Sequence, residues 1–314
     1  MTKVLIATDL HPYFMDELEK MGIICTYLPQ ISKEETKNIL ADYQGLVVRT
    51  QFPIDQDLLS AGIHLEFIGR AGAGLDNIDL VYAESRKIIC LNAPEGNRGA
   101  VSEHTLGLLL ALANHLVKGN QEIRQGIWNR EGNRGFEIEG KTVGIMGMGN
   151  TGMTTSRKLV GLGCQVIGYD PYKSGYAETG IQEGSLIDIW EQSDIISIHV
   201  PLTGETRGMV NDDFLSRFRK PFILLNTSRG EVIKTGDLIG FIRSGKVIGA
   251  GLDVLESEKF PISMDLPWFK ELITLDQVIL SPHVAGWTTE SYLKISKVLA
   301  SKIKDLYSLK KINH

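Results

Sequence analysis

The segment TVGIMGMGNTG, residues 142–152, constrains the fold of this chain more than any other. Its glycines Gly147, Gly149 and Gly152 have the G-x-G-x-x-G spacing, with an apolar run before them and a helical pattern after them. In that setting the first glycine permits a tight turn, the second lets the backbone approach a pyrophosphate, and the third lets helix and strand pack closely. The segment therefore predicts a strand–helix–strand unit whose helix N-terminus binds a dinucleotide phosphate. A glycine-rich turn of purely structural origin is the alternative.

An acidic residue supports the dinucleotide interpretation. Asp170 ends the next apolar run, CQVIGYD, 18 residues after Gly152. A carboxylate at this position accepts hydrogen bonds from the adenosine ribose hydroxyls and repels a 2′-phosphate. The pattern therefore predicts NAD as the cofactor, in preference to NADP.

Short apolar runs alternate with helical patterns from end to end, as in KVLIATD, GLVVRT, IICLNAP, IISIHV, FILLNTS and VILSPH. Continuous apolar strands are typical of parallel sheets that are buried on both faces, and the helices between them make βαβ units. At 314 residues the chain is long enough for two domains. We therefore predict an α/β protein with two doubly wound parallel sheets. The last amphipathic helix, TTESYLKISKVLASKIKDLYSL, has no strand after it, so we expect it to return to the first lobe.

Composition narrows the class of protein. Apolar residues make up 43% of the chain and charged residues 23%, an ordinary globular balance. The net charge of −5 argues against nucleic acid as a partner, and the three cysteines form no C-x-x-C pair, so no metal site is expected. The N-terminus shows no signal-peptide pattern, and the longest apolar stretch, TLGLLLALANHLV, is shorter than the roughly 20 residues that a membrane helix needs. We expect a cytoplasmic protein that does not contact a membrane, with a buried or interface helix from about Ser102 to Val117.

Three later strands of the second series are followed by an arginine, a group of acids and a histidine. FILLNTSRGE carries Arg229, GAGLDVLESE carries Asp253, Glu256 and Glu258, and VILSPH ends in His283. The carboxyl ends of parallel strands form the ligand crevice of a doubly wound sheet, so we expect these side chains to lie near the cofactor. His104 and His115 lack this placement and are expected to be packed on the long helix.

This trio suits hydride transfer from an alcohol. Removing a hydride from an alcohol carbon requires a base for the hydroxyl proton, and histidine suits that task near neutral pH. A carboxylate holds the ring in one tautomer, and an arginine can grip a substrate carboxylate with two parallel hydrogen bonds. Each residue alone also fits a structural or solvated role, so it is their coincidence on one predicted edge that favours a catalytic site. His199, at another strand end, is expected to be a wall of the cofactor pocket.

Seven motifs span essentially the whole chain: GRAGAGLDNID, NAPEGNRGAVSEHTLGLLLALA, GKTVGIMGMGNTG, SDIISIHVPLTGETRGMV, LLNTSRGEVI, GAGLDVLESE and LSPHVAGWT. In these motifs the chain resembles the D-isomer-specific 2-hydroxyacid dehydrogenases, most closely their D-3-phosphoglycerate dehydrogenase branch in a short form without a regulatory domain. The resemblance implies a flavodoxin-like substrate domain of residues 1–97 and 288–314. It also implies a Rossmann dinucleotide domain of residues 98–287, and a homodimer through the long apolar helix after Ser102.

The resemblance also implies roles for individual residues. The Arg–Glu–His catalytic set of the family falls on Arg229, Glu258 and His283. The backbone of Ala71, Gly72 and Ala73 matches a loop that holds the substrate carboxylate. Cofactor-binding positions of the family fall on Ala73, Gly147, Gly149, Asn150, Thr151, Gly152, Asp170, Val200, Pro201, Thr227, Ser228, Asp253 and Gly286. The chain departs from the family after Glu258, where two residues are inserted before Pro261.

Arg49, Arg70 and Arg130 bear on the substrate. Arg49 and Arg70 end predicted strands of the first lobe, and Arg130 follows the expected dimer helix and is expected at a cleft of its own chain or of a partner. Arginines beyond the one needed for a carboxylate suggest a second anionic group such as a phosphate. The alternative is that Arg49 and Arg70 are structural or bind the carboxylate only. The expected reaction is the oxidation of 3-phospho-D-glycerate to 3-phosphohydroxypyruvate, toward serine. The alternatives are a glyoxylate/hydroxypyruvate reductase, a D-lactate or formate dehydrogenase, or an NAD-sensing corepressor-like interaction protein.

Overall fold

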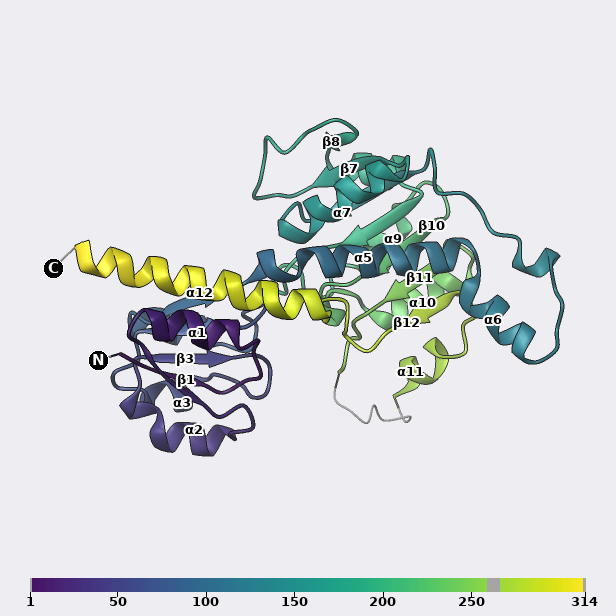
Figure 1. The fold of residues 1–314 in the computed structure, drawn as a ribbon. Helices are drawn as coiled ribbons and strands as arrows, with labels where there is room; N and C mark the ends of the chain where they lie inside the picture. Colours follow the sequence, from purple (N-terminus) through teal and green to yellow (C-terminus); the bar gives the residue numbers. More distant parts are fainter. Residues whose placement is uncertain (1, 259–265, 313–314) are drawn as a thin grey trace. The chain divides into compact units, whose positions relative to one another are not determined.

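The computed structural model describes residues 2–258 and 266–312. The chain divides into two compact units, Met1–Arg98 with Trp287–His314, and Gly99–Gly286. Each unit has its own parallel sheet covered by helices (Figure 1). The predicted α/β fold with two doubly wound parallel sheets is confirmed.

The first unit contains a five-stranded sheet in the order β2-β1-β3-β4-β5, with every neighbouring pair parallel. The strands are β1 (Lys3–Ile6), β2 (Ile24–Tyr27), β3 (Gly45–Val48), β4 (Phe67–Arg70) and β5 (Ile89–Asn92). This is the flavodoxin-like order. Strand β2 was not predicted; it lies at the sheet edge and none of its four residues is buried.

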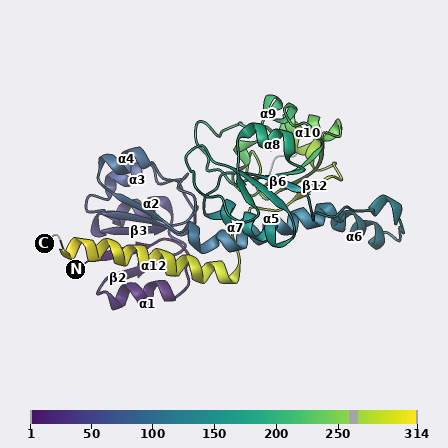
Figure 2. The ribbon, with the colours of Figure 1, turned by 90° about the horizontal axis from the view of Figure 1, so that it is seen from above.

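Helices cover both faces of this sheet. They are α1 (Tyr13–Lys20), α2 (Lys33–Ile39), α3 (Gln56–Ala61), α4 (Leu80–Ser85) and α12 (Thr289–Ile312), with a 3-10 turn η1 (Leu40–Asp42). Helix α12 lies beside α1 (Figure 2), and its Ile295, Leu299 and Ile303 are buried in one core with Val4 and Ile6. The last helix of the chain therefore completes the hydrophobic core of the first unit.

The second unit contains a seven-stranded parallel sheet in the order β12-β11-β10-β9-β6-β7-β8. Its strands are β6 (Thr142–Met146), β7 (Gln165–Tyr169), β8 (Ile181–Glu183), β9 (Ile195–Ile198), β10 (Phe222–Asn226), β11 (Val247–Leu252) and β12 (Val278–Leu280). Six of them follow the Rossmann order, and β12 extends the sheet. Edge strand β8 was not predicted, since Ile181 is its one buried residue. The order reverses between β6 and β9, and in doubly wound sheets the carboxyl ends of the strands at such a point are where ligands bind.

The helices of the second unit begin with α5 (Pro94–Ala113), which starts in the first unit. The others are α6 (Leu116–Arg124), α7 (Asn150–Gly161), α8 (Leu186–Gln192), α9 (Asp212–Ser216), α10 (Thr235–Arg243) and α11 (Pro267–Leu272), with 3-10 turns η2 (Glu131–Asn133) and η3 (Gly230–Val232). No helix in the described part of the chain combines the length and apolar character needed to span a membrane.

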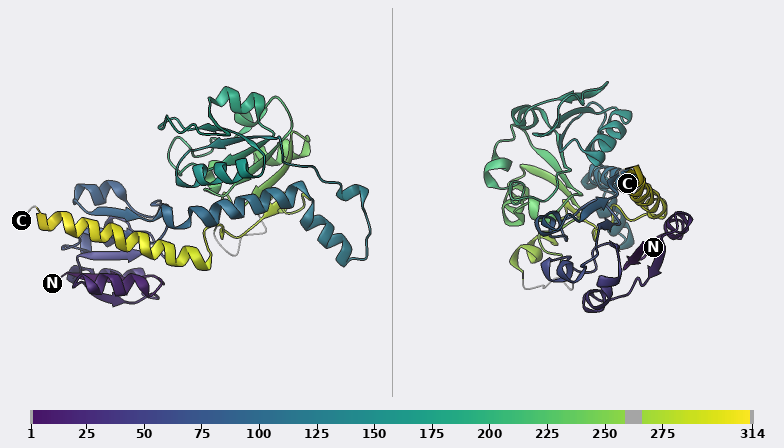
Figure 3. Two further views of the ribbon diagram at one scale, coloured as in Figure 1. Left: turned by 45° about the horizontal axis from the view of Figure 1, so that its top comes forward. Right: turned by 90° about the vertical axis from the view of Figure 1, so that its left-hand side faces the viewer.

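The long helix differs from the prediction at both ends. It begins at Pro94 rather than near Ser102, since proline has no backbone N–H and suits a first helical turn. It ends at Ala113 rather than at Val117, because His115 has a left-handed backbone (φ 50°) that interrupts the helix before α6. Helix α6 and the loop after it extend away from the seven-stranded sheet (Figure 3).

Candidate active site

The phosphate loop joins β6 to α7. Its Gly147 has φ 89°, and a Cβ there would lie 2.7 Å from the carbonyl oxygen of His199. A Cβ on Gly152 would overlap the carbonyl oxygen of Gly147. The backbone therefore requires glycine at both positions. Above Gly149 the space is open, with Lys173 Nζ the nearest atom, 3.9 Å from the position of a Cβ.

The start of α7 is suited to an anion. Gly149 is the N-cap residue and supplies no side-chain acceptor to the first turn. The N–H groups of that turn therefore keep their capacity to bind a ligand oxygen, and the helix dipole adds positive partial charge. Asn150 and Thr151 lie in this first turn. The open space over Gly149 and the uncapped helix together fit the pyrophosphate of a dinucleotide.

Asp170 lies next to this loop, directly after β7. Its Oδ2 accepts a hydrogen bond from the Met148 N–H at 2.9 Å, and its Oδ1 accepts one from the Tyr172 N–H at 3.0 Å. Each carboxylate oxygen retains a lone pair. The side chain is thus fixed beside the phosphate loop with acceptor capacity left for two ribose hydroxyls.

The predicted pocket walls lie at the carboxyl ends of the neighbouring strands. Val200 and Pro201 follow β9, and the Pro201 carbonyl accepts a hydrogen bond from Thr206 Oγ1 at 2.6 Å. Thr227 and Ser228 follow β10, where Thr227 Oγ1 lies 2.9 Å from Thr105 Oγ1. The strand order therefore brings these loops to the same edge as the phosphate loop.

His283 and Glu258 form a direct pair at this edge. His283 Nδ1 lies 2.7 Å from Glu258 Oε2, and the two side chains are 47% and 35% exposed. A carboxylate can only accept, so Nδ1 carries the proton and Nε2 points elsewhere as the free nitrogen. His283 also has a left-handed backbone with φ 53°, which is uncommon for a residue other than glycine. The pair fixes the tautomer of one partly exposed imidazole and leaves the lone pair on Nε2.

Electrostatics keep the carboxylate of this pair ionised. Partial burial alone would raise the pKa of Glu258, but the hydrogen bond and charge of His283 act in the opposite direction. The Leu255 N–H and the charge of Arg229 add to them, so the net pKa lies below its ordinary value. Arg229 itself is fixed by a hydrogen bond from Nη1 to the Ser228 carbonyl at 2.7 Å. The structure thus brings together all three predicted polar residues.

We predict that Glu258→Gln makes the stability of the protein less dependent on pH. Because folding lowers the pKa of Glu258, its carboxylate stabilises the folded state at pH values above its ordinary pKa. This contribution is lost as the pH falls through the lowered pKa. With the side chain 35% exposed, solvent screening limits the contribution to about 1 kcal/mol at most. Urea unfolding at several pH values measures it. Glu191→Gln, an exposed glutamate on α8, is the control. A difference between Glu258→Gln and wild type that stayed constant with pH would contradict the assignment.

The other histidines of this unit have different environments. Burial of the His199 ring lowers its pKa to about 4, and its Nε2 lies 2.8 Å from Ser197 Oγ. It is therefore neutral at physiological pH and unsuited to carry a proton. His104, which was expected to be packed, instead contacts Ser281 Oγ through Nε2 at 2.8 Å. No signal in the sequence around His104 indicated this polar contact, which joins residues 177 positions apart.

Arg49, Arg70 and the loop of residues 71–73 gather at one edge of the first unit. Arg49 Nε donates to the Ala71 carbonyl at 3.1 Å, and its guanidinium lies 4.5 Å from the centre of the Trp287 ring. Arg70 folds back against Gly72, and Asn92 Nδ2 donates to the Ala73 carbonyl at 2.6 Å. These contacts place two cationic side chains beside the backbone of residues 71–73, whose peptide groups can bind a ligand.

Arg130 does not belong to that group. It is exposed on the loop after α6 in the Gly99–Gly286 unit, and its carbonyl accepts the Asn133 N–H. The two inserted residues before Pro261 lie outside the described residues. No group of histidine, cysteine, aspartate or glutamate side chains suited to a metal ion occurs within the described ranges.

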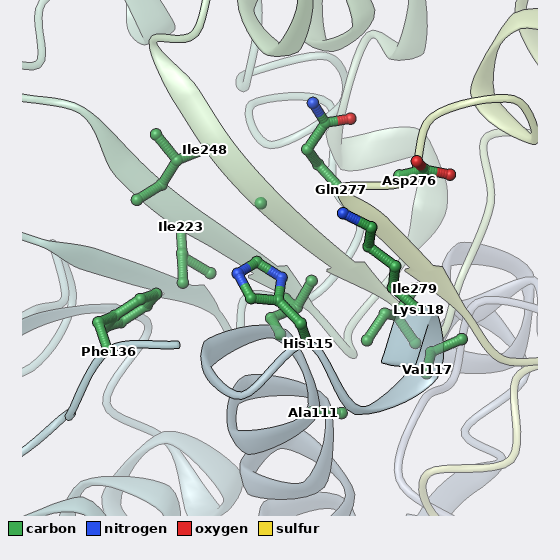
Figure 4. Close-up of a pocket in the computed structure, with 12 residues that line it drawn as sticks. Ala111, His115, Val117, Lys118, Phe136, Ile223, Ile248, Asp276, Gln277 and Ile279 are labelled. Carbon is green, nitrogen blue, oxygen red and sulfur yellow. The ribbon is translucent and has the colours of Figure 1, made fainter. Parts of the chain in front are cut away.

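A pocket of about 270 Å³ lies at the opposite edge of the second sheet (Figure 4). It is lined by Ile223, Gly249 and Gln277, at the amino ends of β10, β11 and β12, and by His115 and Lys118 from the α5–α6 segment. The phosphate loop and the His283–Glu258 pair lie at the carboxyl ends of the strands. This pocket is therefore separate from the candidate active site.

Comparison with known proteins gives three kinds of match. Residues 106–285 match the family described as D-isomer specific 2-hydroxyacid dehydrogenase, NAD binding domain. A D-3-phosphoglycerate dehydrogenase of Archaeoglobus fulgidus is 33% identical over 97% of this chain and 57% of its own length. A hydroxypyruvate reductase of Thermotoga maritima is 35% identical over 87% of this chain and 88% of its own length. The chain thus spans little more than half of the phosphoglycerate dehydrogenase.

A solved structure matches nearly end to end. The D-lactate dehydrogenase from Aquifex aeolicus, complexed with NAD and lactic acid, superposes with a TM-score of 0.82 at 25% identity. The match covers 99% of this chain and 98% of that one. The similarity therefore extends over both units and is not confined to the dinucleotide loop.

Proposed function

The chain belongs to the D-isomer specific 2-hydroxyacid dehydrogenase family, and from this premise we propose that it interconverts a D-2-hydroxy acid and its 2-oxo acid with NAD. The observation that carries the proposal is the His283–Glu258 pair, 2.7 Å apart, at the same sheet edge as the dinucleotide loop. We assign cofactor binding to the Gly99–Gly286 unit and substrate binding to the Met1–Arg98 and Trp287–His314 unit.

The cofactor would be held by the residues described above. In this proposal the N–H groups at Asn150 and Thr151 bind the pyrophosphate and Asp170 binds the adenosine ribose. The loops carrying Val200, Pro201, Thr227, Ser228 and Gly286 would form the walls, and Ala73 would lie beside the cofactor. NAD, when bound, accepts or returns the hydride.

In this proposal His283, Glu258 and Arg229 transfer the proton and bind the substrate. In oxidation, His283 Nε2 takes the hydroxyl proton as the C–H bond breaks and the carbonyl forms, and in reduction it returns that proton to the oxygen. Glu258 keeps the proton on Nδ1 and stabilises the imidazolium that results. Arg229 binds the substrate carboxylate and polarises the neighbouring carbonyl.

The finer proposal is that the acid is 3-phospho-D-glycerate, oxidised to 3-phosphohydroxypyruvate for serine biosynthesis. Arg49 and Arg70 support it, since they supply cationic groups beyond Arg229, and Ala71 and Gly72 add backbone N–H groups for a carboxylate. Arg130 would contribute from the loop after α6, across a homodimer formed through α5. Leu110 on α5, and Leu116 and Val117 on α6, are exposed and suited to such an interface.

A second candidate is reduction of unphosphorylated hydroxypyruvate. The match to the Thermotoga reductase supports it, since that relative is aligned over 88% of its length. Initial rates monitored by NADH absorbance with 3-phospho-D-glycerate, D-glycerate, D-lactate and hydroxypyruvate separate the two. Phosphoglycerate should be preferred, and Arg49→Gln should lower that preference. Equal or better rates with unphosphorylated acids would contradict the phosphate claim. If the protein turned over none of these acids, the remaining interpretation would be an NAD-sensing interaction protein.

We also predict that Asp170→Ala narrows the preference for NAD over NADP by at least about tenfold, because like-charge juxtaposition costs several kcal/mol. The variant loses the carboxylate that lies beside Met148 and would face the 2′-phosphate of NADP. The ratio of kcat/KM for the two cofactors measures the effect. A wild-type enzyme that already prefers NADP would contradict the role given to Asp170.

A further inference from the structure

Asp253 anchors the loop that carries His283. Its main-chain carbonyl accepts the His283 N–H at 2.7 Å. Its carboxylate accepts the Val284 N–H on Oδ1 at 3.0 Å and the Ala285 N–H on Oδ2 at 2.8 Å. Three successive N–H groups thus bind one residue, and Asp253 is only 1% exposed. The Asp253 side chain is therefore buried, and its carboxylate hydrogen-bonds the loop instead of solvent.

These bonds hold His283 in an unfavourable backbone conformation. Its φ of 53° lies in the left-handed region, where residues other than glycine are strained. Such conformations persist when the surrounding structure over-determines them. Because the direction of the imidazole follows from this backbone, Asp253 determines whether Nδ1 meets Glu258.

A second chain of hydrogen bonds leads away from Asp253 to helix α5. Ser281 Oγ donates to Asp253 Oδ1 at 2.6 Å and also lies 2.8 Å from His104 Nε2. A hydroxyl has one proton, and that proton is used toward Asp253. His104 Nε2 must therefore carry a hydrogen and donate it to Ser281. His104 Nε2 also lies 3.4 Å from Asp253 Oδ1.

We propose that His104, Ser281 and Asp253 are positioning residues for His283. His104 donates to Ser281, Ser281 donates to Asp253, and Asp253 fixes the main chain of residues 283–285. The inference rests on the proposed function, because it takes His283 as the proton carrier. It adds that proton transfer depends on a hydroxyl and a second histidine that do not themselves need to contact the substrate.

Paired substitutions test this proposal in the 314-residue chain. Ser281→Ala removes the donor, whereas Ser281→Thr retains it. His104→Ala removes the next donor, whereas His104→Gln retains an N–H. We expect kcat to fall about 10- to 100-fold in both alanine variants, since small misplacements of catalytic groups have effects of this order. The KM for NAD and the NADH affinity measured by fluorescence should change less than about twofold. The threonine and glutamine variants should recover most of kcat.

A second readout does not depend on turnover. The Nδ1–H of His283, hydrogen-bonded to Glu258, should give a downfield NMR proton signal that His283→Asn lacks. We expect Ser281→Ala to weaken or lose this signal. The control is Ser244→Ala, which removes an exposed hydroxyl bonded to the Phe241 carbonyl and should change neither readout.

The outcomes are distinguishable. If the wild type turned over no acid, the proposed function would fail while the NMR comparison still tested the positioning. An unchanged kcat and NMR signal in both alanine variants would overturn the positioning role. Equal losses in Ser281→Ala and Ser281→Thr, or NADH affinity falling in parallel with kcat, would also overturn it and indicate a structural effect.

Discussion

In the His283→Ala variant we expect kcat to fall by a factor of about 10²–10⁴, the usual effect of losing a positioned acid/base. The affinity for NADH should remain close to that of wild type, because the ring lies on the loop after β12 and the phosphate loop lies after β6. Stopped-flow and steady-state rates with the best substrate, combined with NADH fluorescence titrations, measure both quantities.

Two further variants serve as comparisons for His283→Ala. Glu258→Gln should show a smaller loss of kcat, since the amide can still hydrogen-bond the ring but does not stabilise its positive charge. His64→Ala removes an exposed histidine of the other unit and should leave the rate unchanged. A His283→Ala enzyme with wild-type kcat would refute the role of His283 as proton carrier.

The second large effect is expected from Gly152→Ala. The added Cβ would overlap the carbonyl oxygen of Gly147, a backbone atom that cannot rotate away. Helix α7 must then shift relative to β6, which we expect to cost roughly 1–3 kcal/mol of unfolding free energy, as for other overpacked sites. The shift also displaces the N–H groups of the phosphate loop, so NADH affinity should fall at least about tenfold.

Gly161→Ala on the same helix is the matched control. A Cβ there meets nothing within 4 Å, and alanine has a higher helix propensity than glycine by about 1 kcal/mol. Urea unfolding and NADH titration should show a protein at least as stable as wild type with unchanged affinity. If Gly152→Ala bound NADH as wild type does, the assignment of the phosphate loop would be contradicted.

The central strands were predictable from the sequence because each is buried on both faces and leaves a continuous apolar run. Strands β2 and β8 were missed; both lie at sheet edges and few of their residues are buried. The edge strands β5 and β12 are no more buried, but their apolar runs IICLNAP and VILSPH were recognised. The carboxyl end of α5 was misplaced because it depends on the left-handed backbone of His115, which apolar spacing does not encode.

The candidate site, too, was predictable from the sequence only in part. The strand ends predicted which loops would meet and indicated Arg229, His283 and the acids after β11. The choice of Glu258 among those acids came from the family resemblance. The contact between His283 and Glu258 joins residues 25 positions apart, and the one between His104 and Ser281 joins residues 177 apart. Neither distance follows from spacing in the sequence. The network beneath His283 therefore became visible only in the three-dimensional structure.

The interrupted course of the chain has a consequence for biosynthesis. Residues 99–286 form one continuous unit, whereas the first unit needs Ile295, Leu299 and Ile303 from α12 to fill its core. During translation the five-stranded sheet emerges first, yet one of its faces stays incompletely covered until helix α12 has been synthesised. The nucleotide-binding unit can therefore mature earlier than the unit that precedes it, and the nascent N-terminal sheet is the stage at which chaperones would have most to protect.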